Sequence, residues 1–319
     1  MNEVNPVITG GEAVGQILAV LLDDLTRNEA GARASEDTEY LHNYRVAIRR
    51  ARVVIGQFSE VLPAAAAAYF SSEFRWLGQS SSPLRDADTF IQEFERHLAW
   101  LPETVRPNAR QFQDHLRFRR KLEHEKFVIV LSSPRYVLFI AYWRAFAAKG
   151  HTDWNIRAWA LFEDIWSEKI WRLYRRMVRK GRLIGADSPA AVLHELRKDG
   201  KKLRYLIEFF DQISSKQETV KSSPPLRRLR RLQNILGAHQ DYDVQSAAIM
   251  EFFEIQCKGE QASNNTSLAL GILIGQLGAR QALIREKFES CFKKFSRKRS
   301  KRKFRVLCAK PQAKPDTVT

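Results

Sequence analysis

Apolar residues recur every three or four positions along most of the chain, the spacing that places them on one face of an α-helix. Within residues 41–52, for example, Leu41, Tyr44, Ile48 and Ala51 follow this spacing. Strict alternation of apolar and polar residues, typical of a strand, is not evident, so the pattern predicts an all-α fold. The predicted helices lie near residues 11–28, 38–60, 64–80, 84–100, 108–131, 134–148, 156–183, 189–211, 225–236, 239–256 and 265–292.

Two stretches far apart in the chain have related sequences. LHNYRVAIRRAR at 41–52 aligns without a gap with LHELRKDGKKLR at 193–204. Further along, WLGQSSSPLRDAD at 76–88 resembles ILGAHQDYD at 235–243. Each copy therefore predicts a basic helix, another helix, a Leu-Gly turn and a helix with an acidic start.

This repeat indicates two related helical halves. We place them at residues 1–149 and 150–295. Residues 296–319 contain the basic run SRKRSKRKFR and end in AKPQAKPDTVT, and we expect them to form a disordered basic tail.

Basic side chains form a stripe along each of the two repeated helices. At 100° per residue the stripe lies beside the apolar face, which places it at the edge of a helical core. Each stripe runs for ten residues, or about 15 Å. The first contains His42, Arg45, Arg49 and Arg52, with Arg50 beside them; the second contains His194, Arg197, Lys201 and Arg204, with Lys198 and Lys202 widening it.

Like charges at this spacing repel one another by a few tenths of a kcal/mol per pair. A solvated helix face would normally mix in acidic residues, and neither stripe contains one. Two explanations remain: acids on a neighbouring helix that pair with the stripe, or an anionic ligand that binds to it. Because the same positions are basic in both copies, we favour the ligand.

The composition supports an anionic partner. The chain has 53 Lys and Arg against 36 Asp and Glu, a formal net charge of +17. Such an excess favours a nucleic acid, an acidic membrane surface or a phosphate polymer, without choosing among them. With 44% hydrophobic residues the chain has enough apolar side chains for a sizeable core.

We expect a soluble protein in a reducing, intracellular compartment. Cys257, Cys291 and Cys308 lie far apart and form no CxxC pair. The amino terminus lacks the pattern of a signal peptide. The longest apolar run, at 267–279, is shorter than the roughly 20 residues of a membrane helix and contains Gln276. We therefore expect no membrane contact and a cytoplasmic location.

Other charged groups are less informative. Residues 172–179 and 227–231 are also arginine-rich, and a binding role and a solvated face are equally good interpretations of each. The aspartates of RDAD at 85–88 and DYD at 241–243 are better explained as helix caps and partners of arginine than as metal ligands. We predict neither a metal site nor a cofactor.

The repeated elements together resemble the CHAD family, which is named for its histidine-bearing α-helical domain. The resemblance covers about residues 38–295. It is carried by LHNYRVAIRRAR, by SSPLRDAD, by SSPRY at 132–136, by LHELRKDGKKLRYLIEFF at 193–210 and by LQNILGAHQDYDV at 232–244.

The resemblance implies two helical bundles related by a pseudo-twofold axis, with a basic central pore or groove that binds inorganic polyphosphate. It implies no catalysis, because the ExExK motif of the triphosphate-cleaving domain often fused to this family is not found here. Carried over to this chain, the polyphosphate-binding residues are His42, Arg45, Arg49, Arg50, Arg52, His194, Arg197, Lys198, Lys201, Lys202 and Arg204.

The residues themselves leave three functions to compare. A polyphosphate-binding protein, free in the cytoplasm or associated with polyphosphate granules, fits the paired stripes best. A nucleic-acid-binding protein would share the charge, but few aromatic residues accompany it. An enzyme acting on phosphate chains would need a glycine-rich phosphate loop or a cluster of metal-binding acids, and we find neither. The oligomeric state is not predicted.

Overall fold

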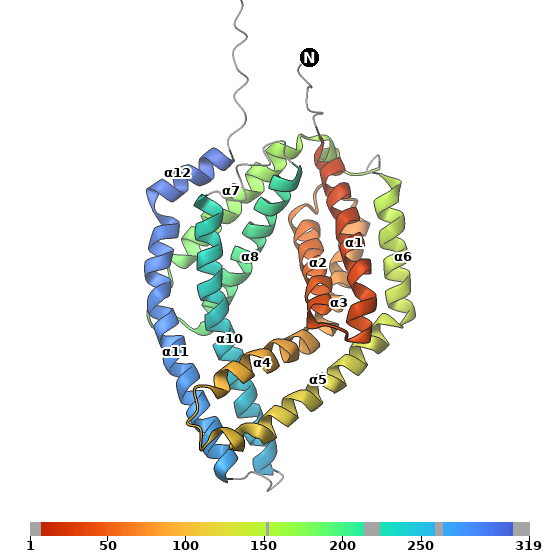
Figure 1. Ribbon diagram of the computed structural model, residues 1–319. Helices are drawn as coiled ribbons and strands as arrows, with labels where there is room; N and C mark the ends of the chain where they lie inside the picture. Colours follow the sequence, from red (N-terminus) through yellow and green to blue (C-terminus); the bar gives the residue numbers. More distant parts are fainter. Residues whose placement is uncertain (1–7, 151–152, 214–223, 259–263, 309–319) are drawn as a thin grey trace, which may run out of the picture.

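The computed structural model describes residues 8–150, 153–213, 224–258 and 264–308 (Figure 1). Helices dominate these ranges, and the described residues contain no strand longer than an isolated antiparallel bridge between Thr9 and Leu161. The all-α prediction is therefore confirmed. The elements are α1 (Gly10–Ala34), α2 (Thr38–Gln57), α3 (Ala64–Ser80), α4 (Ser82–Leu98), η1 (Arg106–Ala109), α5 (Arg110–Leu131), α6 (Pro134–Lys149), η2 (Ile156–Trp159), α7 (Phe162–Gly181), α8 (Ala190–Ile213), α10 (Pro224–Lys258), α11 (Asn264–Ser296) and α12 (Lys298–Leu307).

The second predicted Leu-Gly turn is wrong, because it lies inside a helix; in the first copy the chain turns at Ser81, between the two helices predicted there. Gly78 belongs to α3, and α10 runs without a break through Gly237, joining the two helices predicted at 225–236 and 239–256. A glycine inside a helix costs about 1 kcal/mol relative to alanine, so a packing reason is expected. A Cβ on Gly78 would lie 3.3 Å from the Arg52 guanidinium, and one on Gly237 would lie 3.9 Å from Arg197. Gly78 therefore lets the Arg52 side chain pass close to the backbone, whereas a Cβ on Gly237 would make only ordinary van der Waals contact.

Two hydrophobic clusters hold the helices together. The larger one joins α1, α2, α3, α6, α7 and α8 with parts of α5, α10, α11 and α12. The smaller one lies where α4 and α5 reach the far ends of α10 and α11, and includes Phe90, Phe112, Phe252 and Leu273 (Figure 1). Each cluster combines residues from before and after position 149, so the repeat does not divide the core.

The carboxyl-terminal segment is partly ordered, which corrects the expectation of a disordered tail from residue 296. Residues 298–307 form α12, and its Phe304 is fully buried. The Phe304 ring stacks on Tyr174 of α7 at 4.1 Å between centroids and meets Phe295 edge-on at 5.8 Å. One apolar anchor in a basic run thus fixes the helix on the core. Residues 309–319 lie outside the described part of the chain.

α11 needs separate mention because of its composition. Among the described residues, α11 is the helix that is long enough and apolar enough to cross a membrane. Of its most apolar window, 22% is buried. Length and composition alone are weak evidence, since core helices of soluble proteins pass the same test. Here Ala269, Leu270, Leu273 and Leu277 pack into the smaller hydrophobic cluster.

Candidate functional site

The two basic stripes lie on neighbouring helices. α2 buries Leu41, Tyr44, Ile48 and Ala51 in the large cluster, as its spacing predicts. α8 buries the corresponding apolar residues of the second copy, Leu193, Leu196, Leu203 and Ile207. The two helices contact one another directly, and Figure 1 shows α2 beside α1 and α3 and α8 beside α7 and α10.

An acidic residue of α8 joins the basic residues of three helices. The Glu208 carboxylate lies 3.7 Å from Arg50 of α2, 3.5 Å from Arg204 of α8 and 3.8 Å from Arg230 of α10. The Arg50 guanidinium also lies 4.9 Å from the centre of the Phe209 ring. This shared carboxylate ties the α2 stripe to the α8 stripe.

Lys201 marks the place where the stripes converge. Burial, followed by the positive charges of Arg197, Arg49 and Arg204, lowers its pKa to about 7. Arg49 belongs to α2, so its effect on Lys201 shows that the charges of the two helices act on one another. Lys201, Arg197 and Arg204 line a cavity of about 450 Å³ that α10 closes with Asn234 and Asp241.

Acidic residues border this cavity on one side. Asp241 of α10 lies 3.7 Å from Arg197. Its pKa is raised mainly by burial; Arg197 and Lys201 oppose the rise, while Glu93 and Asp86 of α4 add to it. The cavity therefore has a cationic wall from α8 and an acidic border from α4 and α10.

Arginines of both α2 and α8 carry donors that the protein does not satisfy. The Nε atoms of Arg49, Arg50, Arg197 and Arg204 are buried and have no hydrogen-bond partner among the described residues. A buried donor without a partner costs about 1–3 kcal/mol, more for a charged group. Arg49, Arg197 and Arg204, which all act on Lys201, form a surface suited to an anion with many oxygen atoms.

Arg45, which the sequence placed in the site, is instead a structural residue. Its side chain is 8% exposed. Its guanidinium donates hydrogen bonds to the carbonyl of Gly78 at 3.0 Å, to Ser81 Oγ at 2.8 Å and to Ser82 Oγ at 3.1 Å. Burial and the charge of Arg49 lower its pKa to about 10. Arg45 thus fixes the junction of α3 and α4 against α2.

Three further predicted residues, Lys198, Lys202 and Arg52, lie outside the group around Lys201. Lys198 pairs with Glu195 on its own helix. Lys202 lies near Asp199, Arg176 and Lys180, on the side of α8 that meets α7. The structure therefore does not bring Lys198 and Lys202 to Lys201. Arg52 is exposed on α2, and burial of part of its side chain together with Arg75 lowers its pKa.

The two histidines are only partly equivalent. Burial and then the charge of Arg85 lower the pKa of His42, in the direction expected for a histidine among cations. Nδ1 of His194 lies 2.5 Å from Oε1 of Gln240, a residue of α10. Both rings are half-buried at the amino-terminal ends of their stripes.

Sequence reasoning missed Arg85 and Arg75 as members of the basic surface. Arg85 of α4 donates to the carbonyl of Thr38 at 3.3 Å and acts electrostatically on both His42 and Arg45. Its place in the SSPLRDAD motif was a signal, but the motif alone does not show that α4 turns back toward α2. Asp88 of the same motif is buried and accepts a hydrogen bond from Arg120 at 2.7 Å. The described residues contain no group of acids, histidines or cysteines suited to a metal.

Comparison with known proteins supports the fold. The chain is similar to a crystal structure of the CHAD domain from the plant Ricinus communis, with a TM-score of 0.70, 22% identity and coverage of 91% of this chain and 93% of that one. It is also similar to PptA from Streptomyces chartreusis, with a TM-score of 0.71, 17% identity and coverage of 89% and 99%.

Sequence comparison gives the same assignment. Two uncharacterized proteins of Mycobacterium tuberculosis are 23% identical over 260 residues, which cover 81% of this chain and 48% of theirs. The chain thus spans about half the length of these relatives. The profile of the CHAD domain matches residues 16–249, well over half of the sequence. The chain belongs to the CHAD domain family.

Proposed function

We propose that the protein binds inorganic polyphosphate without cleaving it, through the facing stripes of α2 and α8. The observation that carries this proposal is a set of three arginines that act on Lys201, namely Arg49, Arg197 and Arg204, whose buried Nε donors have no hydrogen-bond partner among the described residues. Arginine binds phosphate oxygens with two parallel hydrogen bonds, and each phosphate of the polymer brings oxygens and charge. Family resemblance points to the same ligand.

A polymer fits the surface better than a single small anion does. The basic residues follow α2 and α8 for about 15 Å each, more than one phosphate group spans. The surface also gives bases little to stack on: Tyr44 and Tyr205, in or directly after the two basic stretches, are 0% and 3% exposed, and Tyr242, the aromatic residue that lines the cavity, is half-buried. We therefore rank nucleic acid second as a partner.

Competition separates these two ligands. Labelled long-chain polyphosphate bound to the full chain is displaced with unlabelled polyphosphate or with single-stranded DNA, at one fixed salt concentration because both interactions weaken with salt. We expect polyphosphate to compete at far lower phosphate concentration than DNA. Equal or better competition by DNA would contradict the proposal.

The absence of cleavage is tested in the same preparation. Incubation of the protein with polyphosphate and Mg²⁺ is expected to release no orthophosphate above the protein-free control. Release that scales with protein concentration and is lost in the Arg49→Gln, Lys201→Gln double variant would show that the site is catalytic.

A further inference from the structure

α7 carries a third basic stripe with the same spacing as the other two. Arg172, Arg175, Arg179 and Arg182 follow one another at intervals of three, four and three residues, as do His42, Arg45, Arg49 and Arg52. Their side chains project from one face of the helix over about 15 Å. Arg172, Arg175, Arg179 and Arg182 are all exposed.

Few acids balance this stripe. Arg172 pairs with Glu168 at its amino-terminal end. Arg175, Arg179 and Arg182 form no ion pair with any described residue. Neighbouring like charges on a helix repel one another, so three unpaired arginines at this spacing carry a cost that a bound anion would remove.

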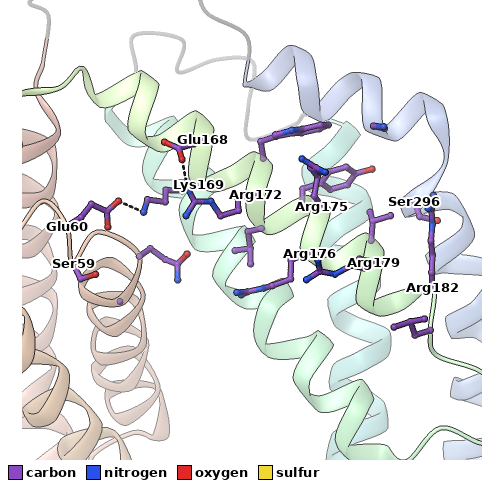
Figure 2. A pocket seen from close by; sticks show the side chains of 18 residues that line it. Ser59, Glu60, Glu168, Lys169, Arg172, Arg175, Arg176, Arg179, Arg182 and Ser296 are labelled. Atoms are coloured by element: carbon purple, nitrogen blue, oxygen red, sulfur yellow. Dashed lines mark hydrogen bonds and ion pairs between the residues drawn. The ribbon is translucent and has the colours of Figure 1, made fainter. Parts of the chain in front are cut away.

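The stripe lines a groove and is not a plain convex surface. A cavity of about 1210 Å³ extends along α7 from the end of α2 to α12. Figure 2 shows the Glu60–Lys169 pair at one end, the arginines of α7 along the groove, and Ser296 at the other end. Lys301 of α12 adds a further cation to the lining.

α12 is held firmly enough to form this wall. Phe304 anchors it by stacking on Tyr174, and Arg305 lies 5.4 Å from the centre of the Trp171 ring. Ser300 is buried; its hydroxyl accepts a hydrogen bond from Arg228 of α10 and donates one to the carbonyl of Lys294 at 2.8 Å. Lys301 is therefore placed by contacts with α7, α10 and α11.

The groove is separate from the α2–α8 site. Between them lies Asp199 of α8, which accepts hydrogen bonds from Arg176 at 2.6 Å and from Lys180 at 2.8 Å. Asp199 is buried, so this clamp seals α7 against α8. The groove and the cavity beside Lys201 have no lining residue in common.

We propose that the groove between α7 and α12 is a second binding site for inorganic polyphosphate. The choice of ligand rests on the function proposed above; the location does not. Arginines dominate the lining, which favours phosphate oxygens. The groove offers bases little to stack on, because Tyr174 is 2% exposed and half-buried Trp171 already has the Arg305 guanidinium 5.4 Å from its ring centre.

Isothermal titration calorimetry with short-chain inorganic polyphosphate tests the proposal on the full chain. Wild-type protein is expected to bind two chains per molecule. Arg175→Gln with Arg179→Gln is expected to remove the groove site and leave one, while Arg49→Gln with Lys201→Gln leaves the other. The matched control, Arg117→Gln with Arg144→Gln, changes the net charge equally at exposed positions of α5 and α6 and is expected to retain both.

The outcomes separate this inference from the proposed function. One chain per wild-type molecule, lost with the Arg49 and Lys201 changes but not with the Arg175 and Arg179 changes, overturns the inference and leaves the proposed function intact. One chain lost only with the Arg175 and Arg179 changes upholds the groove and overturns the α2–α8 site. Binding of single-stranded DNA but not of polyphosphate at the groove overturns the inference.

Discussion

Arg49 of α2 lowers the pKa of Lys201 of α8 across the interface between the two helices, in addition to the larger effects of burial and of Arg197. These two residues occupy matching positions in the two copies of the repeat, the third basic position of each stripe. The repeat therefore brings equivalent cations close together. Such an arrangement is unfavourable by itself and becomes favourable when an anion lies between them.

Lys201 makes polyphosphate binding dependent on pH. With a pKa of about 7, the free amine is largely neutral above pH 7 and charged below it. A bound polyanion favours the charged form and raises the pKa, so binding takes up a proton. Affinity is therefore expected to fall as the pH rises from 7 to 9, by up to about tenfold per unit for one linked proton.

Calorimetry at pH 6, 7, 8 and 9 in buffers of different ionisation enthalpy measures both the affinity and the proton uptake. The control is Lys201→Arg, which stays charged throughout this range. Its affinity is expected to change little with pH. If the affinity of this variant falls with pH as steeply as that of the wild type, Lys201 is not the linked group.

Asp241 is expected to weaken polyphosphate binding, because its carboxylate competes for Arg197 and repels the ligand. At pH 6, where Lys201 is charged with or without this neighbour, Asp241→Asn should bind polyphosphate several-fold more tightly than wild type. Filter binding at fixed salt measures the change. The control is Asp243→Asn, which removes an exposed acid two residues further along α10. An equal gain in affinity in this control would show that the gain comes from the change in net charge and not from the position of Asp241.

Arg45 should matter for stability more than for binding. Replacement by alanine leaves the Gly78 carbonyl and the Ser81 hydroxyl without their buried donor, which is expected to cost about 3 kcal/mol of unfolding free energy. Urea unfolding followed by circular dichroism measures it, with Arg144→Ala expected to change stability by less than about 0.5 kcal/mol. Equal stabilities of the two variants would mean that Arg45 is not a structural residue.

Phe304 tests the order of the carboxyl-terminal helix. Phe304→Ala removes a fully buried ring stacked on Tyr174, and a change of this type costs about 3–5 kcal/mol when the surroundings stay in place. Hydrogen exchange is expected to rise across residues 298–307 while α2 and α8 keep their protection. If α12 exchanges as rapidly in the wild type as in the variant, it is not docked.

The sequence alone was sufficient to predict α2 and α8 and to predict which face of each helix is buried. Because Leu41, Tyr44, Ile48 and Ala51 repeat at helical spacing, the buried face of α2 and the stripe beside it followed directly. The residues of the stripe could not be told apart in the same way. Arg45 and Arg49 look alike in sequence, and only the position of the α3–α4 junction makes Arg45 structural and leaves Arg49 facing α8.

The other differences also come from tertiary contacts. Gly78 and Gly237 have the usual signature of turns, yet both lie inside helices, and at Gly78 a Cβ would crowd the Arg52 guanidinium. Lys202 lies one residue after Lys201 but points toward α7, where Asp199 holds Arg176 and Lys180. The basic run near residue 300 reads as disordered because its one apolar anchor, Phe304, is informative only once Tyr174 and Phe295 are known to lie beside it.

The most direct test of the central claim compares two double variants at pH 6, where Lys201 is charged and both variants therefore remove the same charge. Polyphosphate affinity is measured by calorimetry at physiological salt for Arg49→Gln with Lys201→Gln and for Arg117→Gln with Arg144→Gln. If the stripes of α2 and α8 form the site, the first variant loses at least about tenfold in affinity for one class of sites, and the second loses little. Equal losses in the two variants would show that net charge alone attracts the polymer, and would contradict the account.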